Sequence, residues 1–430
     1  MGIYSTVIAF ALGFMIVFNE IFRKKNSNKH IEILTMVNVI YLLSFSIVPI
    51  LVYFYFENLH IWTQKNDINE IYYLYGSFIS LIVYLLIILA YSFSLKLSVK
   101  PLNLVEDQKK NFSFAISLYF VGFFFLILFI QGVGGFSNFL ETNTLYRSGD
   151  IEVSSVAFAR NLSMFIPVAS HIFYYNLIKN RNYIFSFQLL MTILSFLTSL
   201  LIYYNRAGRL SLLIYLATFF VIYNLVTKRN IKKYLLIFSP IILWFIMYGK
   251  SIYNIFFQNN RSIINREFSL EIILSEFVFP FYTLANTLKY PFFDDSPRLF
   301  VDFIIAFVNL LPSALIPFDV PKNVTQLNTE SFGDISGIPI DMISLGYHSF
   351  GLAGVILITI CFGILIGYVQ RKFSLKEVNI TIVFYAHFLF FLPLRIPYAE
   401  PTNFLKGNFA LLISFLLLLL LYKGRHINKL

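Results

Sequence analysis

The chain has 430 residues, of which 58% are hydrophobic, 19% aromatic and only 13% charged. Soluble domains carry about 25% charged residues, so this composition excludes a water-soluble enzyme, a nucleic-acid-binding protein and a secreted domain. The single cysteine, Cys361, excludes a disulfide framework and any cysteine-based zinc or iron–sulfur site. Long blocks of Ile, Leu, Phe and Tyr predict an all-α polytopic membrane protein, since a membrane β-barrel would show short alternating segments.

A helix that crosses the hydrocarbon core needs about 20 apolar residues. Eleven runs approach this length, at 2–22, 33–56, 71–95, 113–130, 153–178, 184–204, 210–227, 234–249, 350–370, 378–394 and 404–422. The first run is followed by Arg23, Lys24, Lys25 and Lys29 and has no basic residue before it. This order is the reverse of a signal peptide, so we expect an uncleaved first helix with its N-terminus outside.

The distribution of basic residues predicts which connections lie inside the cell. Alternate connections hold 20 of the 33 Lys and Arg residues within 53 positions and have a net charge of +16. These connections are 23–32, 96–112, 179–183, 228–233, 371–377 and 423–430. The opposite connections, with Lys406 near the start of the last run counted among them, have 12 basic and 17 acidic residues, a net charge of −5. The sequence therefore predicts eleven spans with the N-terminus outside and the C-terminus inside, and the net charge of +11 gives no reason to invoke nucleic acid.

One connection, residues 250–349, is much longer than the others and lies on the predicted outer side. Its two apolar segments, 268–288 and 299–318, are punctuated by prolines, which limit helix length. We therefore expect short amphipathic or re-entrant helices here. The chain divides into an eight-helix region at 1–249, this outer loop at 250–349 and three C-terminal helices at 350–430, together forming one integrated membrane domain. Long loops without a function are uncommon, so the loop is predicted to carry the site.

Two arginines share a short outer connection that reads Asn205-Arg206-Ala207-Gly208-Arg209-Leu210-Ser211. Arg206 and Arg209 break the charge bias that the rest of the chain follows. A helix N-terminus offers free N–H groups, and arginine offers planar, bidentate donors that suit phosphate. The pair predicts a diphosphate site; the alternative is a pair of interfacial arginines bound to lipid headgroups.

Further charged residues are candidates for the same site. Arg160 lies inside the fifth predicted span, where an unpaired cation costs at least about 2.5 kcal/mol. His171 follows three helical turns later, so it would share a face with Arg160. Arg147 is the only cation of the glycine-containing stretch at 132–150. A structural pairing of Arg160 with an acidic side chain remains the alternative reading.

The large loop ends in Gly337-Ile338-Pro339-Ile340-Asp341-Met342-Ile343-Ser344-Leu345-Gly346-Tyr347-His348-Ser349-Phe350-Gly351-Leu352-Ala353-Gly354. Asp341 and His348 are seven residues apart and would share a helix face; either could accept a proton if its pKa were tuned. The other reading is an interfacial histidine and a solvated aspartate. Arg298 and Asp302 are spaced i, i+4, which favours a local salt bridge, although Arg298 is also counted among the cations available to a diphosphate.

His387 and Arg395 in the tenth span are weaker candidates for a cavity. The sequence contains no Walker A loop, no GxSxG elbow and no HExxH motif, and it has no acidic pair in the first outer loop. No metal site and no cofactor are therefore predicted.

The helix layout, the large late outer loop, the N-R-A-G-R-L-S segment at 205–211 and the G-Y-H-S-F-G-L-A-G segment within 337–354 resemble O-antigen and capsule repeat-unit polymerases of the Wzy type. The resemblance implies an inverting, metal-independent glycosyltransferase on the outer face of the bacterial inner membrane. Such an enzyme moves a growing glycan from undecaprenyl diphosphate to a fresh lipid-linked repeat unit, commonly with a separate chain-length regulator. It would hold the diphosphate with arginines, here Arg206 and Arg209 with Arg160, Arg147 and Arg298, and take a proton with His348 or Asp341.

The chain departs from that family in two respects. No outer-loop arginine matches the R-x10-G pattern of some members, and the glutamate that many members carry before the F-G-x-x-G segment is absent. Two other functions stay open. An O-antigen ligase would use the same chemistry with a histidine near the end of the loop, here His348. A flippase or transporter for lipid-linked oligosaccharide would show paired halves with broken helices.

Overall fold

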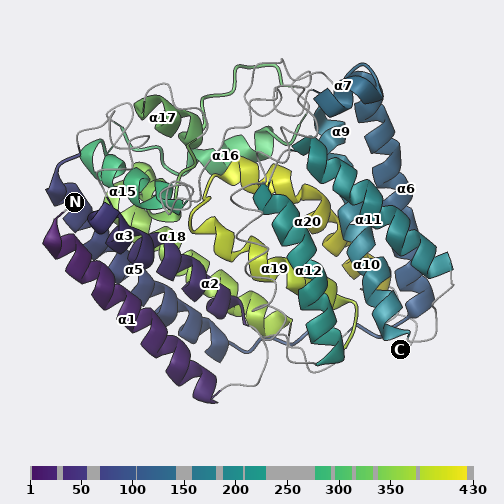
Figure 1. The fold of residues 1–430 in the computed structure, drawn as a ribbon, viewed down its shortest axis with the longest axis horizontal. Helices are drawn as coiled ribbons and strands as arrows, with labels where there is room; N and C mark the ends of the chain where they lie inside the picture. The colour runs from purple at the N-terminus through teal and green to yellow at the C-terminus, as the bar shows by residue number, and fades with distance from the viewer. Residues whose placement is uncertain are drawn as a thin grey trace.

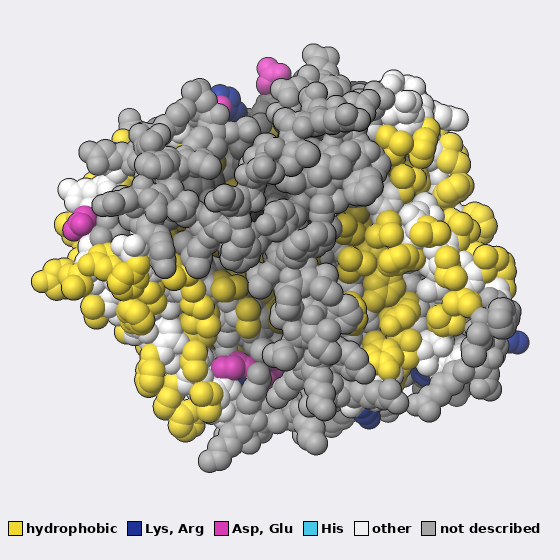
Figure 2. Space-filling view, viewed as in Figure 1, with side chains coloured by type: hydrophobic (Ala, Val, Ile, Leu, Met, Phe, Trp, Pro, Cys, Tyr) yellow, Lys and Arg dark blue, Asp and Glu magenta, His cyan; other side chains and the backbone are white. Residues whose placement is uncertain are grey.

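The computed structural model describes residues 2–26, 32–55, 68–102, 104–141, 157–180, 187–206, 209–228, 277–291, 296–311, 316–332, 338–373 and 378–423. In these parts of the chain every regular element is helical and no strand occurs. Eight of the described helices are long and apolar enough to cross a membrane. Hydrophobic side chains cover the flanks of the molecule in Figure 2, and the visible charged side chains lie mostly toward its upper and lower margins. The predicted fold class, an all-α polytopic membrane protein, is confirmed.

One half of the bundle is built from the N-terminal helices and one late helix (Figure 1). Its members are α1 (Ile3–Asn26), α2 (Ile33–Leu42), the π-helical turn η1 (Leu43–Ile47), α3 (Val48–Tyr55), α5 (Glu70–Lys96) and α18 (Met342–Lys372). Helix α18 lies along α5, with Gly363 against Ala90 and Gly367 against Ser94. Small residues at this seam let the two backbones approach closely, which is how helices associate where lipid removes the hydrophobic driving force.

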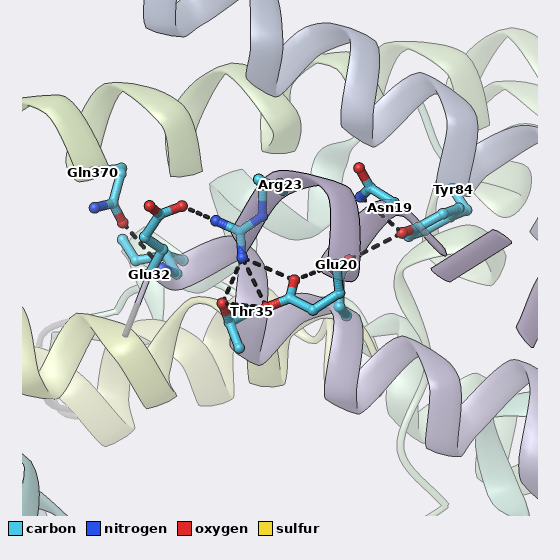
Figure 3. A network of polar contacts seen from close by, with 9 residues as sticks. Asn19, Glu20, Arg23, Glu32, Thr35, Tyr84 and Gln370 are labelled. Carbon is cyan, nitrogen blue, oxygen red and sulfur yellow. Dashed lines mark hydrogen bonds and ion pairs between the residues drawn. The ribbon is translucent and has the colours of Figure 1, made fainter. Parts of the chain in front are cut away.

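A partly buried polar network joins the lower ends of these helices (Figure 3). Arg23 of α1 forms ion pairs with Glu20, at 2.8 Å, and with Glu32 just before α2. Asn38 of α2 donates to Glu20 at 2.7 Å and accepts from the hydroxyl of Tyr84 on α5 at 3.1 Å. A paired and hydrogen-bonded charge is tolerated inside a membrane bundle, whereas an isolated one is not.

The other half of the bundle surrounds a central helix. Its described members are α6 (Gln108–Gly132), α7 (Phe136–Glu141), α9 (Ala157–Leu162), α10 (Phe165–Lys179), α11 (Phe187–Arg206) and α12 (Arg209–Thr227). Helix α10 packs against α6, α11 and α12, and every residue from Phe165 to Phe173 is buried. Gly122 of α6 lies directly against the backbone of Ile166, which brings α6 and α10 close together.

The span predicted at 153–178 is two helices rather than one. Its described part breaks at Ser163 and Met164, between α9 and α10. Pro167 explains the break, because it has no N–H group to donate to the carbonyl of Ser163; the Ile166 N–H bonds that carbonyl instead, at 3.0 Å. Arg160 therefore lies on the short helix α9 and His171 on α10. The prediction that the two residues share one helix face is wrong, because no single helix contains both.

The long connection contains three short helices among its described residues, as the prolines predict. They are α15 (Phe279–Lys289), α16 (Val301–Val308) and α17 (Val324–Ser331), and they lie along the upper end of the molecule in Figure 1. Pro280 stands in the first turn of α15, where its missing N–H has no partner to lose. The eighth predicted span, 234–249, lies outside the described residues, so the predicted total of eleven stays a prediction.

Two helices in the C-terminal region are interrupted at positions that the apolar pattern does not predict. Helix α18 is interrupted at Phe350 and Gly351, and its first two turns fold back so that Gly346 touches the backbone of Gly354 and Val355. The predicted span at 350–370 corresponds to the arm after this break. The span predicted at 378–394 is the 11-residue helix α19 (Thr381–Phe391) followed by the 3-10 turn η4 (Pro393–Arg395). The chain then runs without helix to α20 (Pro401–Lys423).

Polar contacts bring the basic connections together at one end. The Leu102 N–H donates to the Lys372 carbonyl at 2.8 Å. Lys179 lies 3.3 Å from Glu106 and donates to the Val378 carbonyl at 2.8 Å. Connections that the charge distribution assigns to one side thus share one end of the bundle, away from α15, α16 and α17.

Candidate active site

A cavity of about 440 Å³ lies between α10, α11, α12 and the α19–η4–α20 segment. This volume is in the range of small-molecule sites. Apolar side chains of α12 and α20, including Leu213 and Leu411, form part of its wall. Its polar lining includes Tyr203, Arg206, His387, Arg395, Tyr398 and Glu400. Of the residues predicted as principal site residues, Arg206 lines this cavity, and so do the weaker candidates His387 and Arg395.

Arg206 is the last residue of α11, where a cation is favoured by the partial negative charge of the helix C-terminus. Its Nη2 donates to the carbonyl of Arg160 at 3.1 Å and to Oδ1 of Asn161 at 3.0 Å. Its Nε is buried and makes no hydrogen bond with a described residue. Arg206 forms no ion pair within the described part of the chain, so its charge has no described counter-ion.

Arg160 supports this position from the neighbouring helix. Its Nη2 donates to the carbonyl of Asn205 at 2.9 Å, while its own carbonyl accepts from Arg206. Each of the two arginines thus donates a hydrogen bond to a backbone carbonyl of the other helix, and these bonds join α9 to the end of α11. Arg160 does not line the cavity, so its placement favours a structural contribution over direct ligand contact.

Arg395 brings a second guanidinium group to the same cavity. Its Nε donates to the carbonyl of Phe391 at 3.3 Å, and its Cζ lies 5.5 Å from the Phe391 ring centroid and 5.1 Å from that of Phe404. These distances are typical of cation–π contacts, which hold arginine at a half-apolar surface. No described carboxylate lies within ion-pair distance of Arg395, so the cavity contains two cations without described counter-ions.

Glu400 is the carboxylate of this cavity, and the sequence analysis missed it. It is 2% exposed and precedes α20, where its Oε1 accepts from the Thr402 N–H at 3.0 Å. Its Oε2 is buried and makes no hydrogen bond with a described residue. Burial raises the pKa of Glu400 above its ordinary value, the carboxylate of Asp302 acts in the same direction, and the polar groups of Thr402 and Thr325 act against it.

Two histidines meet in the interior below these charged groups. The ring centroids of His387 on α19 and His171 on α10 are 4.7 Å apart, at 78° between planes. His171 Nε2 lies 3.1 Å from the carbonyl of Tyr215. His171 is fully buried and does not line the cavity, so it packs against a cavity residue without facing the cavity itself.

Asp341 serves as the N-cap of α18 and does not line the cavity. Its Oδ1 accepts from the N–H groups of Ile343, at 2.9 Å, and Ser344, at 3.0 Å. Its Oδ2 accepts from the Ser344 hydroxyl, and the side chain is fully buried. Burial raises the pKa of Asp341 to about 6, although the capping bonds act against this change. All of the described bonds of this carboxylate serve the start of the helix.

His348 lies in the folded-back part of α18, also outside the cavity lining. Its Nε2 is 3.1 Å from Oγ1 of Thr287 on α15. Its carbonyl accepts from the Arg298 N–H at 3.0 Å. Arg298 is bound in turn through Nε and Nη2 to Asp302, each at 2.8 Å, which is the i, i+4 salt bridge that the spacing predicts. Arg298 is therefore paired and is not a member of the cavity.

Two predicted site residues fall beyond the described side chains. Arg147 lies outside the described residues, as does the side chain of Arg209, although Arg209 begins α12. Within the described part of the chain, no three His, Cys, Asp or Glu side chains come close enough to hold a metal ion.

The segment 392–401, Leu-Pro-Leu-Arg-Ile-Pro-Tyr-Ala-Glu-Pro, was the signal for the residues that sequence reasoning missed. Three prolines and two opposite charges between apolar runs indicate irregular backbone at membrane depth, which is tolerated only where it lines a cavity or is buried in protein.

Comparison with known proteins identifies no relative: no family model, curated protein or solved structure matches the chain.

Proposed function

We propose that the chain is a glycosyltransferase of the bacterial inner membrane that polymerises undecaprenyl-diphosphate-linked oligosaccharide repeat units at the outer face. The observation that carries this proposal is the pair Arg206 and Arg395 in one largely apolar cavity, where neither arginine forms an ion pair with a described residue. Two guanidinium groups fit the two phosphates of a diphosphate, and guanidinium binds phosphate bidentately. The apolar wall from α12 and α20 suits the first part of a polyprenyl chain.

The chemistry asks little of the protein beyond charge and position. Diphosphate is a good leaving group, so catalysis needs cations that neutralise the departing charge and a surface that aligns the acceptor hydroxyl. Arg206 and Arg395 would supply the first, and the aromatic lining at Tyr203 and Tyr398 would help to position sugar rings. The proposal includes inversion at the anomeric carbon and no requirement for a metal ion.

The test is reconstitution of the purified full-length protein with a synthetic undecaprenyl-diphosphate repeat unit, without added metal and in the presence of a chelator. We expect a ladder of products that differ by one repeat unit. A single transfer to added lipid A core, without a ladder, would assign the chain as a ligase. Movement of the lipid across vesicles without new glycosidic bonds would assign it as a transporter. Either result would overturn the polymerase proposal.

A further inference from the structure

We infer that Glu400 is the catalytic base that takes the proton from the acceptor hydroxyl. The inference rests on the proposed function and goes beyond it, because it assigns the proton-accepting step to a residue outside the large loop. It places that step at the start of α20, in the cavity that contains Arg206 and Arg395.

The surroundings of Glu400 distinguish it from a structural carboxylate. Two structural carboxylates use both of their oxygens: Asp341 accepts three bonds as a helix cap, and Asp302 binds Arg298 and the Val324 N–H. Glu400 accepts one backbone bond at Oε1, and the hydroxyls of Thr402 and Thr325 are its polar neighbours. Its Oε2 makes no hydrogen bond with a described residue, although Glu400 shares a cavity with two cations. A buried carboxylate oxygen without a partner is costly unless it serves a ligand.

The position of Glu400 also fits the geometry of an inverting transfer. Glu400 follows Arg395 by five residues in a segment that contains no regular helix between η4 and α20, so both line the same cavity from one stretch of backbone. The arginines would hold the leaving diphosphate, and the acceptor hydroxyl must approach from another side of the sugar. A carboxylate that lines the cavity but forms no ion pair with either arginine can meet that hydroxyl.

The step balances in atoms and electrons. The acceptor oxygen forms a bond to the anomeric carbon of the donor glycan while its proton passes to Oε2 of Glu400. The bond between that carbon and the diphosphate oxygen breaks, and the leaving diphosphate takes the electron pair. Release of the proton to solvent returns Glu400 to its carboxylate form.

The raised pKa of Glu400 suits this use, because a general base works best when its pKa lies near the operating pH. The charged and titratable groups that line the cavity with Glu400 are Tyr203 and Arg206 on α11, Tyr215 on α12, His387 on α19, Arg395 on η4 and Tyr398. The carboxylate of Asp302 on α16 also acts on Glu400. Asp302 is held by the ion pair with Arg298. His387, which lines the same cavity, is the other group of this set that could accept a proton from a hydroxyl.

The experiment compares Glu400→Gln with wild type in the same reconstituted assay and measures donor-lipid binding separately. Glutamine retains an oxygen for the Thr402 N–H but cannot take a proton. We expect polymerisation to fall by roughly 10²- to 10⁴-fold, with donor binding within about threefold of wild type. Glu400→Asp should recover part of the rate. Glu70→Gln, an exposed carboxylate at the start of α5, is the matched control and should polymerise normally.

The outcomes separate this inference from the proposed function. If wild type gives a ladder and Glu400→Gln polymerises at a near-normal rate, Glu400 is not the catalytic base, and the polymerase proposal stays intact. Equal loss of binding and transfer would make Glu400 part of the cavity framework and would also overturn the base. Wild-type rates should rise with pH while the residual rate of Glu400→Gln stays flat; if His387→Gln flattens the profile instead, the proton goes to histidine. Absence of any ladder from wild type would refute the proposed function itself.

Discussion

The arginines at the upper end of the bundle differ in how completely their charge is used. Arg298 meets Asp302 with two bonds, and Arg160 is engaged by the end of α11. Arg206 and Arg395 line the cavity and form no ion pair with a described residue, although Glu400 lines the same cavity. The capacity of this region to bind an anion depends on how many guanidinium N–H donors remain available to a ligand. The number of arginines in the region does not determine it.

Replacement of either cavity arginine should weaken binding of the donor lipid. Because hydrogen bonds to charged groups contribute about 1.5–3 kcal/mol, Arg206→Ala and Arg395→Ala should each raise the Kd for an undecaprenyl-diphosphate lipid roughly 10- to 100-fold. Lysine at either position should restore little, since it cannot reproduce the planar fork. Equilibrium binding to the reconstituted protein measures the effect, with Lys228→Ala as an exposed cation control. Unchanged binding in the double alanine variant would remove the diphosphate role.

Asp341 should affect stability more than catalysis, because its bonds cap α18. Its pKa is raised from 3.8 to about 6, so the folded state favours the protonated carboxyl. The protonated carboxyl of Asp341 therefore contributes to the free energy of unfolding. This contribution is fully present below pH 3.8 and is lost as the pH rises through about 6, and its full size is roughly 3 kcal/mol. Wild type should therefore gain stability relative to Asp341→Asn as the pH is lowered from 7 to 4.5, in denaturant unfolding of the detergent-solubilised protein. A pH-independent difference, with turnover lost from a stable Asp341→Asn protein, would return Asp341 to the chemistry.

At the scale of the element, apolar length predicts where helices lie but not where they break. The runs at 33–56, 71–95 and 210–227 correspond to described helices within a few residues, because burial in lipid requires continuous backbone bonding. The breaks at Ser163 and at Phe350 depend on tertiary partners: Ile166 packs against Gly122, and the turn at Gly351 is held by the contact of Gly346 with Gly354. These contacts join residues that are apart in the sequence, so the local sequence pattern does not predict them. The cavity that contains both Arg206 and Glu400 could not be predicted for the same reason.

The seam between α5 and α18 should tolerate no added side-chain volume. A Cβ atom at Gly363 would meet the Ala90 side chain and the Ile87 backbone, so Gly363→Ala must push the helices apart. We expect a loss of about 1–3 kcal/mol in unfolding free energy, as for other overpacked sites. Gly407→Ala on α20 is the matched control, because a Cβ atom added there would meet nothing within 4 Å, and it should be neutral or slightly stabilising. Equal stability of the two variants would contradict close packing at the seam.

At the scale of the whole molecule, charge and architecture agree on two distinct ends. Basic connections meet through the contacts of Leu102 with Lys372 and of Lys179 with Glu106. The cavity arginines and the short helices α15, α16 and α17 belong to the opposite end. A lipid-linked substrate that is presented at the outer face would reach the cavity without crossing the bundle, which makes the orientation of the protein a condition of the proposed function.

Orientation can be tested by labelling single cysteines in intact cells. With Cys361 replaced by serine, Ser98→Cys reports on a basic connection and Asp319→Cys on the large connection; both original residues are exposed. Because the connections on the basic side hold 20 of the 33 Lys and Arg residues, they should remain in the cytoplasm. A membrane-impermeant maleimide should therefore label Asp319→Cys directly and label Ser98→Cys only after permeabilisation. The reverse labelling pattern would show the opposite orientation in the membrane. Arg206, Arg395 and Glu400 would then lie toward the cytoplasmic side, which would rule out polymerisation at the outer face.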